Sequence, residues 1–185
     1  MNKRRLVSVM QILTVVVIVM LGMGKSSVAS VQERPAPRPR VDVATSISLE
    51  EARIIIDAAV AHVRGEKGHA AIAVVNDNGN LVSMDRMDGT SSFFERFAVG
   101  KAVGAVALQQ STAESAEQYK TNPQRFLSAL SMLQGEILLI RGGFPLVVDG
   151  RLVGGVGSAG HAGDGDVAAV KAGIAAWERF RQSRR

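Results

Sequence analysis

Two short turn sequences constrain the fold of this 185-residue chain more than any other feature. Asn78-Gly79 separates the apolar segments HAAIAVV and LVSMDRM, and Asp149-Gly150 lies in the middle of FPLVVDGRLVGGVG. Asn-Gly and Asp-Gly pairs readily adopt the positive φ angles that a tight β-hairpin turn needs. Each turn therefore predicts a β-hairpin, and strands joined by hairpins pair in an antiparallel sheet.

Four segments with helical spacing of apolar residues surround the two predicted hairpins. The first begins after Ser48, whose side chain fits a capping box with that of Glu51, and it ends at Gly65. The other three cover residues 92–110, 122–134 and 166–180. The predicted order is helix, hairpin, two helices, hairpin and helix. This order indicates a single α+β domain over residues 46–182.

Residues 1–30 have the layout of a signal peptide. A cationic start is followed by an apolar run over about residues 6–23, and then by small residues suited to cleavage after Ala29 or Ser30. We therefore expect a periplasmic or extracellular mature protein. An uncleaved membrane anchor is the alternative, because the run is near the lower length limit for crossing a bilayer. Residues 31–45 are rich in proline and arginine, which predicts an extended linker.

The positive charge of the chain is concentrated in the predicted signal peptide. The chain has 22 Lys and Arg against 17 Asp and Glu, which gives a net charge of +5. Residues 1–30 hold four of the cations and no acidic residue, so the remainder has 18 cations against 17 anions. No basic stripe with aromatic residues remains, and nucleic acid is not an expected partner. The lack of cysteine excludes disulfides, thiolate metal sites and cysteine nucleophiles.

The segment from Gly142 to Asp166 is rich in glycine. Glycine within a strand marks a place where another backbone or a ligand comes close. Gly155, Gly157 and Gly160 match the letters of the dinucleotide-binding pattern GxGxxG. The structural context of that pattern is missing, because no βαβ unit surrounds it and no later strand supplies an acidic residue for a ribose. A nicotinamide cofactor is therefore not expected.

Several segments, in their order along the chain, resemble one known family. They are ISLEEARIIIDAAVAHV, AIAVVNDNGNLVSMDRMDG, AVGKAVGAVAL, GGFPLVVDGRLVGGVGSAG and DGDVAAVKAGIAAW. Together they resemble the GlcG/HbpS family of haem-degrading domains, which is related to the C-terminal domain of PduO-type proteins. The resemblance covers about residues 46–178. One motif departs from the family pattern, because it ends in GVGSAG where the family has G-V-S-G.

The resemblance implies a profilin-like fold, in which helices pack around an antiparallel sheet, and homo-oligomers of up to eight subunits. It also implies binding of haem or a related tetrapyrrole, with a role in haem scavenging, haem degradation or redox sensing. Other members of the family accompany glycolate utilisation. A small-molecule enzyme or accessory protein of glycolate-type acid catabolism is therefore the alternative function.

Five residues form the expected binding site. The resemblance links Thr112 to the haem iron and places Lys101 where its ammonium can meet a ligand carboxylate, although a capping threonine and a snorkelling lysine are the alternatives. His62 falls near the buried face of the first helix, either as an interior histidine or as an iron ligand. Gly143 and Gly157 leave bare backbone that a ligand can approach.

The sequence favours a binding protein over an enzyme. Its acidic residues show no spacing that dictates an acid–base pair, and GVGSAG lacks the strand–Ser–helix context of a nucleophile elbow. No two of the three histidines have the i, i+4 spacing of a helical metal site, so a zinc site is not expected. Met84 and Met87 are further candidates for an iron ligand, although methionine near a hairpin also fills cores.

Overall fold

The computed structural model describes residues 46–184, so the predicted signal peptide and linker lie outside the described residues. The elements follow one another as α2 (Leu49–Gly65), β1 (Ala71–Asn76), β2 (Leu81–Arg86), α3 (Phe93–Leu108), α4 (Thr112–Thr121), α5 (Pro123–Met132), β3 (Gly143–Val148), β4 (Arg151–Ala159) and α6 (Gly165–Gln182). Of these helices, none is long and apolar enough to cross a membrane.

The strands form one antiparallel sheet in the order β2-β1-β4-β3. Each predicted hairpin is present, and β1 pairs with β4 to join the two. Asp149 and Gly150 have φ angles of 49° and 77°, as a two-residue hairpin turn requires. At the first turn, Gly79 has a φ of 80°, and the side chain of Asn76 accepts a hydrogen bond from the backbone N–H of Asn80. The predicted α+β class with an antiparallel sheet is confirmed.

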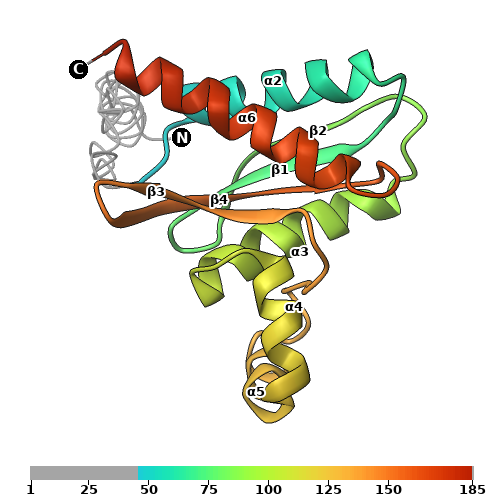
Figure 1. The fold of residues 1–185 in the computed structure, drawn as a ribbon, viewed down its shortest axis with the longest axis vertical. Helices are drawn as coiled ribbons and strands as arrows, with labels where there is room; N and C mark the ends of the chain where they lie inside the picture. The colour runs from blue at the N-terminus through green and yellow to red at the C-terminus, as the bar shows by residue number, and fades with distance from the viewer. Residues whose placement is uncertain (1–45, 185) are drawn as a thin grey trace, which may run out of the picture. The chain divides into compact units, whose positions relative to one another are not determined.

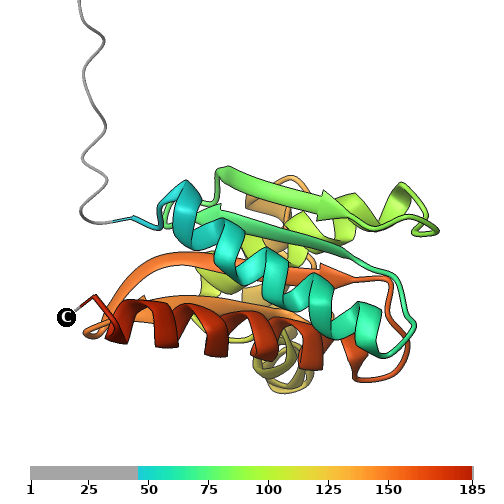
Figure 2. The same ribbon diagram turned by 90° about the horizontal axis from the view of Figure 1, so that it is seen from above.

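Helices cover both faces of the sheet and produce three layers (Figure 1). On one face α2 and α6 lie side by side (Figure 2). The main core lies between these two helices and the sheet, and its large members include Ile55, Ile56, Ile72, Val74, Val156 and Trp177. On the other face α3 packs on small side chains such as Ala71 and Ala73. Because both faces are covered, β1 is buried throughout Ala71–Val75.

The beginning of α2 is fixed by the predicted capping box. The Ser48 side chain accepts a hydrogen bond from the Glu51 N–H at 3.2 Å, and the Glu51 carboxylate accepts one from the Ser48 N–H at 3.0 Å. Glu51 also accepts a hydrogen bond from the indole N–H of Trp177 at 3.1 Å. The cap therefore ties the start of α2 to α6, in addition to satisfying free backbone groups.

Glycines in β4 allow α3 to pack directly on the sheet. A Cβ atom at Gly157 would lie 2.2 Å from the carbonyl oxygen of Ala98, and one at Gly155 would lie 2.6 Å from that of Ala102. Both distances are too short for any side chain, so the helix backbone can come this close only over glycine. At these positions the glycine-rich segment serves close backbone packing.

Three helices separate the hairpins within the described chain, whereas the apolar spacing in the sequence predicts two. The additional helix is α4, which Ser111 and Glu114 begin with a second capping box. Its sequence, TAESAEQYKT, has no apolar stripe, and only Thr112 and Ser115 are buried in it. Together α4 and α5 extend away from the three layers (Figure 1). We call residues 111–142 the arm.

Candidate functional site

Lys101 is buried in α3, with 4% of its side chain exposed. Its ammonium donates hydrogen bonds to the Ser158 carbonyl oxygen at 2.6 Å and to the carboxylate of Asp166 at 2.9 Å. Asp166 also accepts hydrogen bonds from the Ser158 hydroxyl and from the backbone N–H of His161. The cation that the sequence analysis assigned to a ligand carboxylate is therefore already paired with a carboxylate of this chain.

Thr112 is fully buried at the first position of α4. Its hydroxyl donates a hydrogen bond to the Ile140 carbonyl oxygen at 2.7 Å and accepts one from the Gly143 N–H at 3.0 Å. These bonds tie the end of the arm to its beginning. Iron ligation by Thr112 would require this buried hydroxyl to leave its backbone partners, while the capping role belongs to Ser111.

Four of the five predicted site residues gather around the middle of α3. A Cβ atom at Gly143 would lie 2.4 Å from the Lys101 carbonyl oxygen and 2.7 Å from Thr112 Cγ2, and Gly157 contacts the same stretch of α3. The structure thus brings Lys101, Thr112, Gly143 and Gly157 together, but as closely packed backbone and side chains. None of them lines the groove described below.

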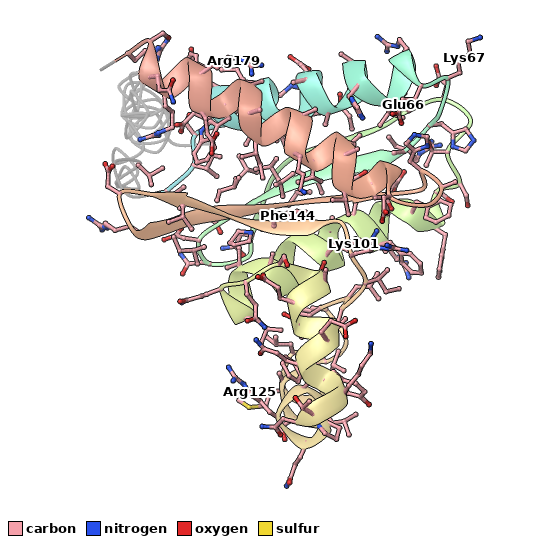
Figure 3. The ribbon with its side chains drawn as sticks, in the orientation of Figure 1. Glu66, Lys67, Lys101, Arg125, Phe144 and Arg179 are labelled. Atoms are coloured by element: carbon pink, nitrogen blue, oxygen red, sulfur yellow. The ribbon has the colours of Figure 1, made fainter. Side chains whose placement is uncertain are left out.

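His62 lies apart from these four residues, on α2 at the other face of the sheet. Its side chain is 32% exposed, and its Nε2 atom is 3.5 Å from Glu66 Oε1. Glu66 Oε2 lies 2.7 Å from Nε2 of His161, and this hydrogen bond holds the pKa of Glu66 below its ordinary value. Figure 3 shows Glu66 at the end of α2 and Lys101 on the far side of the sheet. Within residues 46–184, no group of three or more His, Asp or Glu side chains could hold a metal ion.

An open groove of about 740 Å³ lies beside the sheet edge that β2 forms, on the α3 side. We call it the β2–α3 groove. Strand β2, helix α3 and residues 135–138 of the arm supply its walls. Its main apolar side chains are Leu81, Met84, Phe93, Phe97, Val103 and Leu138. Phe93 is 58% exposed and Leu81 is 53% exposed, so the groove presents apolar surface to solvent.

The arm forms one wall of the groove because glycine in α3 lets it come close. The Leu138 N–H donates a hydrogen bond to the Gly100 carbonyl oxygen at 2.9 Å, and a Cβ atom at Gly100 would lie 3.2 Å from Leu138 Cβ. A Cβ atom at Gly104, one turn later, would lie 3.5 Å from the Leu138 carbonyl oxygen. The wall is therefore fastened to α3 by backbone contacts.

Charged groups line the groove together with the apolar walls. Glu95 forms an ion pair with Arg86 at 2.6 Å. Arg96 is exposed, and among the described residues no acidic side chain forms an ion pair with it. Glu136 is also exposed in the lining. A groove of this size, with apolar walls and a free guanidinium, suits a flat apolar ligand that carries an acidic group.

The β2–α3 groove was not predicted from the sequence. Met84 was considered as a ligand, but nothing in the sequence joined it to Phe97 and Leu138. One signal was present, because Gly100 and Gly104 are separated by one helical turn in α3. Small residues at that spacing leave a furrow along one side of a helix, where another segment can lie.

Comparisons with known proteins agree with the observed architecture. A family model described as "Haem degrading protein HbpS-like" matches residues 47–175. Protein GlcG of Escherichia coli (strain K12) is 29% identical over 111 residues, which are 60% of this chain and 79% of GlcG.

Two crystal structures have the same fold and a similar sequence. HbpS is 29% identical, with a TM-score of 0.64, over 77% of this chain and 95% of that chain. The protein in a PduOC:heme complex is 26% identical, with a TM-score of 0.63, over 71% of this chain and 94% of that chain. The family match includes both hairpins and every described helix up to the middle of α6. This chain therefore belongs to the HbpS-like family of haem-degrading proteins.

Proposed function

We propose that this protein binds haem or a closely related tetrapyrrole in the β2–α3 groove. The observation that most supports the proposal is the groove itself, which joins an apolar hollow of about 740 Å³ to Arg96, a cation that forms no ion pair with the described residues. Membership of a haem-degrading family and the similarity to a PduOC protein in complex with haem point to the same ligand.

The residues of the groove fit a haem group in three respects. Phe93 and Phe97 offer aromatic surface to the faces of the macrocycle. Arg96 offers a free guanidinium to a propionate. Met84 offers a thioether, which is one of the groups that hold haem iron in proteins. When bound, haem would supply a redox-active iron, while these side chains would bind and orient the ring.

We propose further that the mature protein is exported and forms a homo-oligomer. The cationic and apolar layout of residues 1–30 supports export. Exposed apolar side chains on the arm, Leu127 at 54% and Met132 at 83%, support association between copies. Expression of the full chain in a Gram-negative host should yield a mature N-terminus near Ser30 or Val31. Recovery of an intact N-terminus from membranes would instead establish an anchor.

Hemin titration tests the binding proposal. The mature protein should give a saturable Soret shift at micromolar hemin. Leu138→Glu places a carboxylate in the groove wall and should weaken binding about tenfold or more, because burying a charge beside an apolar ligand is costly. Leu49→Glu is the matched control, since Leu49 is exposed at the first position of α2 outside the groove, and it should bind as the unaltered protein does. Absence of saturable binding, or equal effects of both changes, would overturn the proposal.

A further inference from the structure

Of the side chains in the described part of the chain that line the groove, only one belongs to a residue type that commonly ligates haem iron in proteins. The common ligand residues are histidine, cysteine, methionine and tyrosine. Among the described lining residues, Met84 alone belongs to this set. The other lining groups with an oxygen donor are Asn80, Glu95 and Glu136, and the carboxylate of Glu95 is engaged with Arg86.

The histidines lie elsewhere in the described chain. His62 contacts Glu66 on the opposite face of the sheet, and His161 is held by the same carboxylate. The ring of His69 lies next to Gly89, before β1 begins. None of these three residues lines the β2–α3 groove. A haem bound in the groove therefore cannot be ligated by a histidine of the same subunit without rearrangement of the fold.

The backbone places Met84 on the groove side of the sheet. Met84 pairs with Ala73 of β1, and the side chains of both pack on the α3 face with Ala98. Met84 is partly exposed and lies in the edge strand, so its thioether is available to a ligand that enters from the open side. Methionine is unbranched and has three rotatable bonds, so its sulfur can adjust to the position of a ligand.

We propose that Met84 is the iron ligand of this protein and makes the β2–α3 groove selective for iron-loaded tetrapyrroles over the metal-free ring. This inference rests on the proposed function, because it applies only if a tetrapyrrole enters the groove. The apolar walls and Arg96 bind the ring whether or not it holds a metal, whereas the thioether contributes only when iron is present. As a soft ligand, the thioether favours ferrous over ferric iron.

Titrations of four proteins test the assignment, namely the unaltered chain, Met84→Leu, Met87→Leu and His62→Ala. Each protein is titrated with hemin, with hemin under reducing conditions, and with protoporphyrin IX. The unaltered protein should bind both ligands, and ferrous haem most tightly. Met84→Leu, a change of similar volume that cores tolerate well, should keep its affinity for protoporphyrin IX and lose about tenfold for ferrous haem. In the titration with ferric hemin, it should also lose the sulfur-to-iron charge-transfer absorption that a thioether ligand gives. Met87→Leu is the matched control, because Met87 packs against the core on the other face, and His62→Ala tests the histidine alternative.

The outcomes separate the two proposals. Failure of the unaltered protein to bind either ligand would reject the groove as a tetrapyrrole site. Binding of both ligands with a haem spectrum unchanged by Met84→Leu would keep the groove and reject Met84 as the ligand. A spectrum that changes in His62→Ala but not in Met84→Leu would also reject it. The assignment would be supported if Met84→Leu alone lost the higher affinity for ferrous haem than for protoporphyrin IX.

Discussion

Lys101 Nζ and Asp166 Oδ2 lie 2.9 Å apart, in an ion pair that joins α3 to the first turn of α6. The two helices lie on opposite faces of the sheet, so this contact connects the outer layers directly. Only 4% of the lysine side chain and 13% of the aspartate side chain are exposed. A ligand carboxylate could use this ammonium only by displacing Asp166.

Lys101→Met should therefore destabilise the fold. Removal of one partner from a buried pair leaves the other charge uncompensated, which typically costs about 3–5 kcal/mol. Urea unfolding monitored by circular dichroism should show this loss in the free energy of unfolding. The matched control is Lys120→Met, because Lys120 pairs with Glu117 on the surface and such pairs contribute about 1 kcal/mol or less. Equal effects at both sites would show that the buried pair is not needed for stability.

Gly157→Ala should also destabilise the protein, because even a methyl group meets the backbone of α3. The added Cβ atom would lie 2.2 Å from the Ala98 carbonyl oxygen, so α3 must move away from the sheet. Overpacking of this kind costs about 1–3 kcal/mol or more. Gly65→Ala, at the last position of α2, places a methyl group in open space and should be neutral or stabilising. Thermal melts of both variants measure the difference, and a normal melt for Gly157→Ala would contradict the packing role.

Thr112→Val should loosen the base of the arm. The change keeps the shape of the side chain but removes the hydroxyl that bonds to the Ile140 carbonyl oxygen and the Gly143 N–H. Leaving these buried groups unpaired costs about 1–3 kcal/mol. Thr121→Val, at the exposed end of α4, is the control. Hydrogen exchange should increase at Gly143 in the first variant only. A changed haem spectrum with unchanged stability would instead support iron ligation by Thr112.

Glu66 should make the fold sensitive to acid. The hydrogen bond with His161 lowers the pKa of Glu66 in the folded state below the ordinary value of 4.5. A carboxyl with a lowered pKa stabilises the fold above its unfolded value, and this contribution is lost as the pH falls through the folded pKa. Unfolding of Glu66→Gln should therefore depend less steeply on pH below about 4.5. NMR titration of the Glu66 carboxyl should show its pKa rising in His161→Ala, and an unchanged pKa would contradict the assignment.

Structural features that depend on neighbouring residues could be predicted from the sequence. The turn at Asp149-Gly150 and the capping box of Ser48 and Glu51 depend on contacts within a few residues, and both are present. The helix α4 was missed because the prediction relied on apolar periodicity. Ser111 and Glu114 repeat the same capping pattern, so the local signal for its start was present in the sequence.

The candidate site depends on contacts between distant parts of the chain. Lys101 and Asp166 are 65 residues apart, and no local pattern shows that the lysine has a carboxylate partner. The groove likewise combines β2, α3 and the end of the arm, so its existence follows from the way these segments pack. Glycines were recognised as positions of close approach, but the sequence could not show that the approaching group at Gly157 is the backbone of α3.

The hydrogen bonds that Thr112 forms with Ile140 and Gly143 have an evolutionary consequence. The arm leaves the layered body next to Ser111 and returns at Gly143, where the hydrogen bond between the Gly143 N–H and Thr112 holds its two ends together. We therefore expect insertions, deletions and substitutions in the exposed part of the arm to disturb the sheet little. Because residues 135–138 also form a wall of the groove, the same mutations reshape the ligand-binding surface. Ligand preference can thus diverge among descendants of this chain while the scaffold stays the same.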